Sequence, residues 1–413
     1  MKYLQLTLHI LNNMKRNLLA AFTLLILLAS CSETNQEELN IKKRATRSKV
    51  INANNDFAFS FFREIASEEK ESNYMVSPVS LSLAMGMLFN GTKDATSEAM
   101  SAGLGYANFN TKNLSEINKN IIDNLTSDHL KIANSNWIKQ GFDVKKDFID
   151  LNKEYYYAEV KTEDFNNPNT VDKINNWTSD QTNQKIKTII DEISSDAVLF
   201  LINAIYFNAE WKLEFEEKNT NQQLFYPESG NSEHIDMMHL QTDKLFYQKN
   251  DLFSSVILPY KNDKYSMTIL LPNEGKSTND IVEKLNSNTW ENWQNNYKTS
   301  DVSLSLPKFK FEYKNTLNDE LTNLGFGTLF DNPDLSGISD ARLEVSKVLQ
   351  KTFIDVNEKG TEAAAVTVIG IEVTSLPQIF EINCNKPFLF LITEKITGSI
   401  CFIGKVGRPE YSE

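Results

Sequence analysis

Cysteine and histidine are scarce in this sequence, which has three cysteines and four histidines among 413 residues. Cys31 lies near the start of the chain, so only Cys384 and Cys401 belong to the part that follows it. Both lie in apolar runs typical of strands. A chain of this length with two cysteines does not depend on disulfides. We therefore expect both side chains to be buried free thiols.

Motifs of catalysis and of metal binding are also missing. The sequence contains no Gly-x-Ser-x-Gly, no His-Glu-x-x-His, no P-loop and no Cys-x-x-Cys. His234 and His239 flank Met237-Met238, but the pattern supplies no further metal ligands nearby. We interpret these histidines as surface residues and predict a protein that is not an enzyme and needs no cofactor or metal.

Interdomain linkers are missing as well, and positive charge is in deficit. No stretch rich in proline, glycine and serine divides the chain, and no segment repeats. The formal net charge is −13, which disfavours nucleic acids and anionic membrane surfaces as partners. An acidic surface is compatible with a cationic partner.

The N-terminal segment has the pattern of an exported protein. Basic Met14–Arg16 is followed by the apolar run Leu18–Leu28 and by Ala29-Ser30-Cys31, which is the arrangement of a signal peptide. The apolar run is too short for a comfortable transmembrane helix, and Met14 is an alternative start. We predict a signal peptide over 1–31 and a flexible polar tether over 32–48.

Cys31 gives this leader a more specific interpretation. Leu28-Ala29-Ser30-Cys31 resembles the bacterial lipoprotein box, in which the cysteine is lipidated and becomes the mature N-terminus. The alternative is a plain secretory signal with an incidental cysteine. The first interpretation predicts a surface-exposed outer-membrane lipoprotein of a bacterial envelope, in contact with the membrane only through its lipid anchor.

Hydrophobic periodicity predicts helices mainly in the first half of the remaining chain and strands mainly in the second, as in an α+β fold. Val198–Phe207 is a nearly continuous apolar run, as expected of a central strand covered on both faces. Further strands are predicted over Ser254–Leu258 and Tyr265–Leu271, and helices over Asp56–Glu71, over Ser80–Phe89, from Val171 onward and over Tyr313–Leu324.

The most informative segment lies near the C-terminus, at 356–374. Gly360 permits a positive φ or a sharp bend, small residues follow it, and Val366–Val373 is β-prone. With a period of two, one face of a strand would carry only uncharged residues, namely Thr361, Ala363, Ala365, Thr367, Ile369, Ile371 and Val373. Such a segment can enter the middle of a sheet. The simpler alternative is an ordinary buried strand after a turn.

Glu358–Ala365 resembles the hinge of the serpins, the proteinase inhibitors that trap their target by loop insertion. Other stretches resemble serpin segments in the same order along the chain: Asn73–Leu81, Asn203–Trp211, Leu306–Phe309, Asp334–Gly337, Asn385–Phe390 and Phe402–Pro409. The resemblance extends from about Asn55 to Pro409. It implies one α+β serpin domain over 49–413, with a large mixed central β-sheet, further sheets, about eight or nine helices and an exposed reactive loop.

The resemblance implies a suicide inhibitor of serine endopeptidases, with cysteine endopeptidases as a further target class. The target attacks one bond of a loop that runs from Gly360 to about Asn383, and the cleaved loop inserts into the central sheet and traps the acyl-enzyme. We expect a monomer whose partner is the target endopeptidase. Two alternatives stay open: a non-inhibitory, serpin-like surface binding lipoprotein, and an adhesin or structural lipoprotein with the same fold.

The resemblance also places the reactive bond. We predict cleavage at Thr374-Ser375, with Val373 as a secondary site. A count from the other end of the loop gives Leu376-Pro377 instead, where few serine proteases cut. No Lys or Arg occurs between Lys359 and Lys386, so we predict an elastase-like or subtilisin-like target rather than a trypsin-like one.

The predicted hinge comprises Glu358, Lys359, Gly360, Thr361, Glu362, Ala363, Ala364, Ala365 and Thr367. The predicted breach and shutter, at the top and in the middle of the central sheet, comprise Lys308, Trp211, Ser77, Ser80, Asn203 and Gln350. Lys308 and Glu358 are expected to form an ion pair with Trp211 packed close by. Gln350 departs from the family, which usually has His there. Gln still donates and accepts hydrogen bonds, but the pH dependence of that network would be lost.

Overall fold

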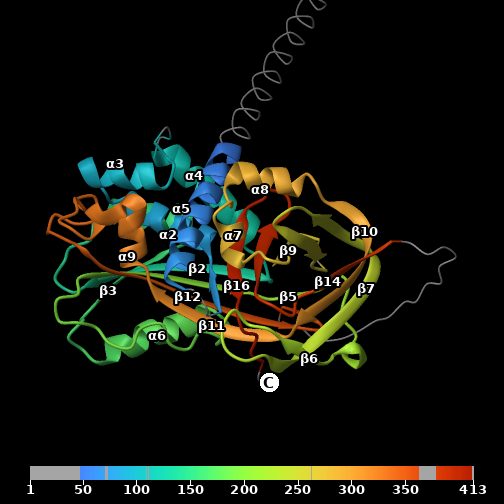
Figure 1. The fold of residues 1–413 in the computed structure, drawn as a ribbon. Helices are drawn as coiled ribbons and strands as arrows, with labels where there is room; N and C mark the ends of the chain where they lie inside the picture. Colours follow the sequence, from blue (N-terminus) through green and yellow to red (C-terminus); the bar gives the residue numbers. More distant parts are fainter. Residues whose placement is uncertain are drawn as a thin grey trace, which may run out of the picture. The chain divides into compact units, whose positions relative to one another are not determined.

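The computed structural model describes residues 47–69, 73–107, 109, 111–261, 263–361 and 378–411. The chain divides into two compact units, Met1–Lys49 and Val50–Glu413, and the fold is that of the second unit (Figure 1). The predicted signal peptide, Cys31 and the tether up to residue 46 lie outside the described residues. Residues 47 and 48, which the sequence assigned to the tether, are helical.

The larger sheet consists of β1 (Tyr74–Val76), β6 (Asn221–Phe225), β7 (Glu233–Lys249), β8 (Phe253–Pro259), β9 (Tyr265–Pro272), β10 (Lys298–Pro307), β14 (Ile379–Asn383), β15 (Phe388–Glu394) and β16 (Ile400–Val406). Its order is β1-β16-β15-β9-β8-β7-β10-β14, with β6 paired to β7 outside this path. β14 is parallel to β10. The last strands of the chain, β15 and β16, therefore lie between β1 and β9.

The smaller sheet consists of β2 (Leu130–Lys139), β3 (Glu159–Glu163), β4 (Leu199–Phe207), β5 (Ala209–Glu210), β11 (Phe309–Thr316), β12 (Val345–Asn357) and β13 (Gly360–Thr361). Its order is β3-β2-β4-β12-β13-β5, with β11 paired to β12. Because β4 is parallel to β12 and antiparallel to β2, the sheet is mixed. Every residue of β4 is buried, which confirms the predicted central strand.

The described helices lie on both faces of this smaller sheet and also against the larger sheet, where the helix Thr278–Val282 contacts β9 (Figure 1). They are residues 47–68, α2 (Pro78–Phe89), α3 (Asp94–Gly103), α4 (Thr111–Leu125), α5 (Lys146–Tyr156), α6 (Asn169–Gln181), α7 (Thr278–Val282), α8 (Ser287–Gln294) and α9 (Asn318–Leu321), with short helical turns at Glu217–Asn219, Thr322–Phe326 and Gly327–Leu329. Figure 1 shows α6 on one face of the sheet and α2 and α5 on the other. An inner strand such as β4 is consequently shielded from water on both sides.

α2 is the helix that reaches the middle of the smaller sheet. All twelve of its residues are buried, so small side chains are needed wherever another element comes close. A Cβ added to Gly86 would lie 3.0 Å from Asn118 Nδ2 of α4. Pro78 occupies the first turn, where its missing N–H costs no helical hydrogen bond. The predicted helix over Ser80–Phe89 is therefore confirmed.

Most of the other predicted elements are confirmed, but one helix is wrong. The predicted strands near 254–258 and 265–271 correspond to β8 and β9, and the helix from Val171 lies within α6. The predicted helix over Tyr313–Leu324 begins instead at Asn318, because β11 continues to Thr316. Aromatic residues alternate with charged ones along β11, and this period of two marks a strand. The leucines that follow have helical spacing, and the prediction extended it too far back.

Cys384 and Cys401 are buried free thiols, as predicted. Burial raises the pKa of both thiols well above its ordinary value, so neither is poised to react as a thiolate. Among the described residues, no helix is long and apolar enough to cross a membrane.

Candidate functional site

The pairing between the central strands β4 and β12 changes along their length. From Leu199 opposite Val345 up to Ala204 opposite Lys351, the two strands pair directly. Near the other end, β13 lies between β12 and β5 and pairs with both in antiparallel fashion. In the described sheet, no rung joins residues 205–207 of β4 to residues 352–355 of β12. The two strands therefore separate over residues 205–207 and 352–355. The predicted hinge, which begins beside β13, lies at the end of this gap where β13 pairs with β5 and β12.

Gly360 is needed for close approach rather than for an unusual backbone angle. Its φ is not positive, contrary to one of the reasons suggested by the sequence. A Cβ at this position would lie 2.4 Å from Ala209 O and 2.6 Å from Glu210 Cα. Only glycine lets the hinge lie against β5 at this distance.

Thr361 is already buried in the sheet. Its side chain is 1% exposed, and its hydroxyl lies 2.8 Å from the hydroxyl of Tyr260. Tyr260 in turn stacks on Trp211, with ring centroids 4.5 Å apart. The face of the hinge that carries Thr361 therefore points into the core.

The hinge carboxylate Glu358 sits in a charged cluster. Lys308 Nζ lies 3.2 Å from Glu358 Oε2, with side-chain exposures of 15% and 9%, so the expected ion pair is present. Thr220 donates its hydroxyl to Glu358 Oε1 at 2.7 Å. Trp211 Nε1 donates to the carbonyl of Asn357 at 3.0 Å, which places the indole beside the pair. We call Lys308, Glu358, Thr220 and Trp211 the hinge cluster.

The electrostatics of the hinge cluster favour the charged form of Glu358. Burial by itself raises the pKa of the carboxyl group. The Thr220 hydroxyl, a backbone N–H and the Lys308 ammonium outweigh this effect, and the net pKa lies below its ordinary value. Lys359, the next residue, only approaches Glu217 at 3.8 Å on the surface.

The middle of the sheet is held by uncharged groups. Gln350 Oε1 accepts from Ser77 N at 2.9 Å, and its Nε2 donates to Ser77 O at 3.0 Å and to Asn203 Oδ1 at 2.8 Å. Asn203 Nδ2 donates to Ser80 Oγ and, at 2.7 Å, to Asn134 Oδ1. We call Ser77, Ser80, Asn134, Asn203 and Gln350 the amide network. It joins α2 to the three neighbouring strands β2, β4 and β12.

Sequence reasoning missed Asn134, Thr220 and Tyr260. Asn134 lies opposite Asn203 in the β2–β4 ladder. The available signal was the polar stretch Asn134-Ser135-Asn136 between the apolar residues Ala133 and Trp137 of β2, since a buried amide needs a partner. Thr220 and Tyr260 carry no comparable local signal, because their contacts with Glu358 and Thr361 join segments far apart in the chain.

Part of the predicted site lies outside the described residues. This part comprises Glu362, Ala363, Ala364, Ala365 and Thr367 of the hinge and Val373, Thr374 and Ser375 at the predicted reactive bond. The chain is described again from residue 378 and enters β14 beside β10. Both ends of the predicted loop are therefore fixed in sheets.

His239 corrects the prediction that the histidines are surface residues. It is half-buried, and its Nδ1 lies 2.9 Å from Ser305 Oγ on the neighbouring strand β10. Burial lowers the pKa of its imidazole. His234 is exposed, as predicted. Among the described residues, no group of His, Cys, Asp and Glu is arranged to hold a metal ion.

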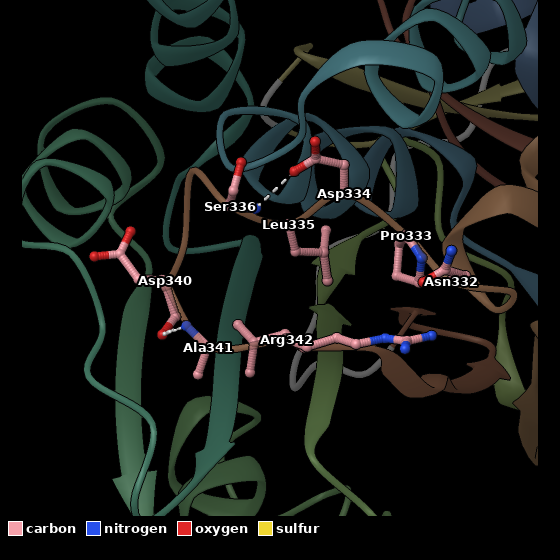
Figure 2. Close-up of a pocket in the computed structure, with 10 residues that line it drawn as sticks. Asn332, Pro333, Asp334, Leu335, Ser336, Asp340, Ala341 and Arg342 are labelled. Carbon is pink, nitrogen blue, oxygen red and sulfur yellow. Dashed lines mark hydrogen bonds between the residues drawn. The ribbon is translucent and has the colours of Figure 1, made fainter.

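A surface hollow of about 330 Å³ lies in the loop 332–343, within the segment that contains the Asp334–Gly337 motif (Figure 2). Ser336 N donates to Asp334 Oδ1 at 3.0 Å, as the dashed line in Figure 2 shows. Gly337 N donates to Gly91 O at 3.0 Å, and a Cβ on Gly337 would lie 2.7 Å from that oxygen. The motif is thus explained by tight packing of this loop on the turn after α2.

The family model of the serpins, described as serine protease inhibitors, matches residues 52–409. The chain belongs to the serpin family. A serpin-like protein of Methanosarcina acetivorans is 35% identical over 383 residues, which cover 88% of this chain and 89% of that protein. Human serpin B4 is 34% identical over 389 residues, with coverages of 86% and 98%.

Solved structures show that the fold is the α+β serpin fold. The thermophilic serpin tengpin in its native state has a TM-score of 0.81 at 33% identity, covering 87% of this chain and 94% of its own. Human thyroxine-binding globulin in complex with thyroxine also has a TM-score of 0.81, at 28% identity, with coverages of 89% and 100%. Serpins are generally protease inhibitors rather than enzymes, and this globulin shows that the fold can also bind a small ligand.

Proposed function

We propose that this serpin is a suicide inhibitor of serine endopeptidases, with cysteine endopeptidases as a further target class. The observation that carries the proposal is β13: Gly360 and Thr361 already pair with strands on both sides, at the top of the opening between β4 and β12. A loop that continues from this point after cleavage would first meet the unpaired edges of residues 205–207 and 352–355, and it would then have to separate the directly paired part of β4 and β12. The new strand would then complete the sheet.

The register of the hinge supports insertion without a shift. Carried on residue by residue, both ladders of β13 would bring Thr367 to Asn203 on β4 and to Gln350 on β12. These two residues already lie opposite each other in the native sheet. Because Thr361 faces the core, the same face of the inserted strand would carry Ala363, Ala365 and Thr367. None of these is charged, so burial of this face is inexpensive.

The energetics also favour a trap. About fourteen inserted residues at ~3.3 Å each would carry an acylated protease roughly 45 Å. The new hydrogen bonds, at about 0.5–1.5 kcal/mol each, would release on the order of 10 kcal/mol. Such a native state is metastable and is preserved by a kinetic barrier. The release is large enough to distort the active site of the protease and stall deacylation.

We assign the reactive bond to Thr374-Ser375, with Val373 as a secondary site, and the target to the elastase-like or subtilisin-like proteases. A small or β-branched residue before the bond suits a shallow apolar pocket, whereas a trypsin-like enzyme requires Lys or Arg. We further propose that the protein is a surface-exposed outer-membrane lipoprotein, lipidated at Cys31 and tethered through residues 32–48. Metabolic labelling with a fatty-acid probe tests the anchor, and equal labelling of Cys31→Ala would exclude it.

Incubation of the protein with pancreatic elastase, subtilisin and trypsin tests the function. We expect an SDS-stable covalent complex with one of the first two, and a C-terminal fragment that begins between Thr374 and Leu376 by mass spectrometry. Thr361→Arg should be cleaved as a substrate without complex, because position 361 is already buried in the sheet and an arginine there would displace the hinge from which insertion starts. Thr361→Ser should keep the complex. Cleavage without any covalent complex would favour the non-inhibitory, ligand-binding alternative.

A further inference from the structure

The segment Pro409–Tyr411 is directed along the outer edge of β11. Asn73 Oδ1 accepts from the backbone N–H groups of Gly407 and Arg408, each at 2.9 Å, and Asn73 Nδ2 donates to Arg408 O at 2.5 Å. One strand further, Lys310 N donates to Glu410 O at 2.8 Å. The segment is therefore fixed at its base to the larger sheet and at its end to the smaller sheet.

This route brings the ring of Tyr411 against two lysines, one paired with the hinge residue Glu358 and the other with Asp355 of β12. Lys308 Nζ lies 4.4 Å and Lys310 Nζ 5.9 Å from the ring centroid. Lys308 pairs with Glu358, and Lys310 lies 3.4 Å from Asp355 Oδ2 at the end of β12. Both carboxylate side chains are only 9% exposed. The two lysines thus contact the Tyr411 ring and also pair with the carboxylates of Glu358 and Asp355.

The hydroxyl of Tyr411 stays neutral in this setting. Burial, followed by the nearby Asp355 carboxylate, raises the pKa of Tyr411 to about 12. An ionised phenolate would repel Asp355 and compete for the lysines. The neutral ring offers only its π face to the ammonium groups, which is a favourable contact when the cation is partly desolvated.

We propose that Tyr411 is a positioning residue for the inhibitory reaction. Its ring holds Lys308 and Lys310 against Glu358 and Asp355, and so ties the β11–β12 side of the smaller sheet to the larger sheet. The hinge then stays in its native position until the loop is cut. This inference rests on the proposed function for its biological meaning, but the restraint itself is a property of the uncleaved protein and can be measured without a protease.

Tyr411→Ala removes the ring, and Tyr411→Phe keeps it. We expect the alanine variant to lose its monomeric native form about five- to tenfold faster on mild heating, in line with the loss of one partly desolvated cation–π contact. The phenylalanine variant keeps the ring and loses only the hydroxyl contacts with Asn357 and Asp355, so its acceleration should be clearly smaller than that of the alanine variant. Glu410→Ala is the matched control, because Glu410 contributes a backbone carbonyl to the contact with Lys310 and its side chain is exposed.

Two readouts separate positioning from a general loss of stability. Hydrogen exchange by mass spectrometry should speed up at 355–361 in Tyr411→Ala while β15 and β16 stay unchanged. In a Lys308→Met background, Tyr411→Ala should add less acceleration than in the wild type, since the nearer of the two cations is already gone. Equal exchange in both regions, equal effects of the alanine and phenylalanine variants, or full additivity with Lys308→Met would overturn the proposal.

The proposed function and this inference can fail separately. If the wild type forms no covalent complex with any protease while Tyr411→Ala still frees the hinge, inhibition fails and the positioning role stands. If the wild type traps elastase and Tyr411→Ala leaves both exchange at 355–361 and the heating half-life unchanged, the positioning role fails and inhibition stands.

Discussion

The hinge cluster and the amide network stand at two levels of the same sheet and use different chemistry. The hinge cluster holds Glu358 with a lysine, a hydroxyl and a neighbouring indole. The amide network holds Asn203 and Gln350 with neutral amides, hydroxyls and backbone groups. An ion pair therefore stabilises the sheet near β13, where the hinge begins, whereas hydrogen bonds between neutral groups stabilise its middle. The two levels should respond to different perturbations.

The largest effect is expected from Glu358→Lys. The change breaks a partly buried ion pair and leaves two ammonium groups facing each other, which costs about 3 kcal/mol. Loop–sheet polymers should form on mild heating and appear as a ladder on native gels. Glu217→Lys is the matched control, because the same reversal falls on a pair whose acid is 73% exposed. If Glu358→Lys stays as monomeric as this control, the hinge cluster does not protect the sheet against loop insertion from another molecule.

Asn203→Ala tests the middle of the sheet. It removes partners from Gln350, Ser80 and Asn134 at once, and we expect a loss of about 2 kcal/mol from the unsatisfied buried groups. The readout is the temperature at which the monomer disappears. Ser82→Ala on α2 is the control, since its buried hydroxyl has no hydrogen-bond partner among the described residues. Similar losses in both variants would mean that α2 packing, rather than the amide network, sets the stability.

Gln350→His would make the amide network sensitive to pH. A buried imidazole has a pKa below its unfolded value of about 6.5, because burial disfavours the cation. The unfolded state then binds more protons, so stability falls as the pH drops through that unfolded value, by up to about 1.4 kcal/mol for each unit of depression. The variant should match the wild type at pH 8 and polymerise faster at pH 5.5. A flat profile in the variant would contradict the assigned burial of this position.

The smallest effect is expected from salt. Raising the ionic strength to 1 M shortens the Debye length to about 3 Å and weakens the exposed side of the hinge cluster. Hydrogen exchange at 357–361 should quicken by about twofold, while the amides of Leu201–Ala204 in β4 should not change. An equal increase in hydrogen exchange at both sites would mean that the hinge cluster and the amide network do not differ in their dependence on charge.

Features with a local pattern were predictable from the sequence. The continuous apolar run of β4, the Ser77-Pro78 start of α2 and the two apolar cysteine segments each carry a signal within about ten residues. The Lys308–Glu358 pair was predictable only through the resemblance of the hinge to a known family. Nothing in the composition or spacing joins these two residues, which lie fifty positions apart.

Features that depend on register between distant strands were not predictable. Asn134 meets Asn203 only because β2 and β4 pair in one specific alignment. The role of Gly360 depends on how closely β5 approaches, which a single residue type does not reveal. The end of β11 was misplaced because a helical leucine spacing follows directly on a strand pattern. At such a junction, the longer run of residues with helical spacing hides the shorter strand pattern that precedes it.

The position of β15 and β16 within the larger sheet has a consequence for how the protein is made. These strands are the last described segments to leave the ribosome, yet they lie between β1, which begins at Tyr74, and β9. During synthesis, the facing edges of β1 and β9 have no partner, and open strand edges are sites of wrong pairing. The nascent chain cannot close this sheet until β15 and β16 have been synthesised. Closure therefore requires these two strands to insert between two strands that were made earlier.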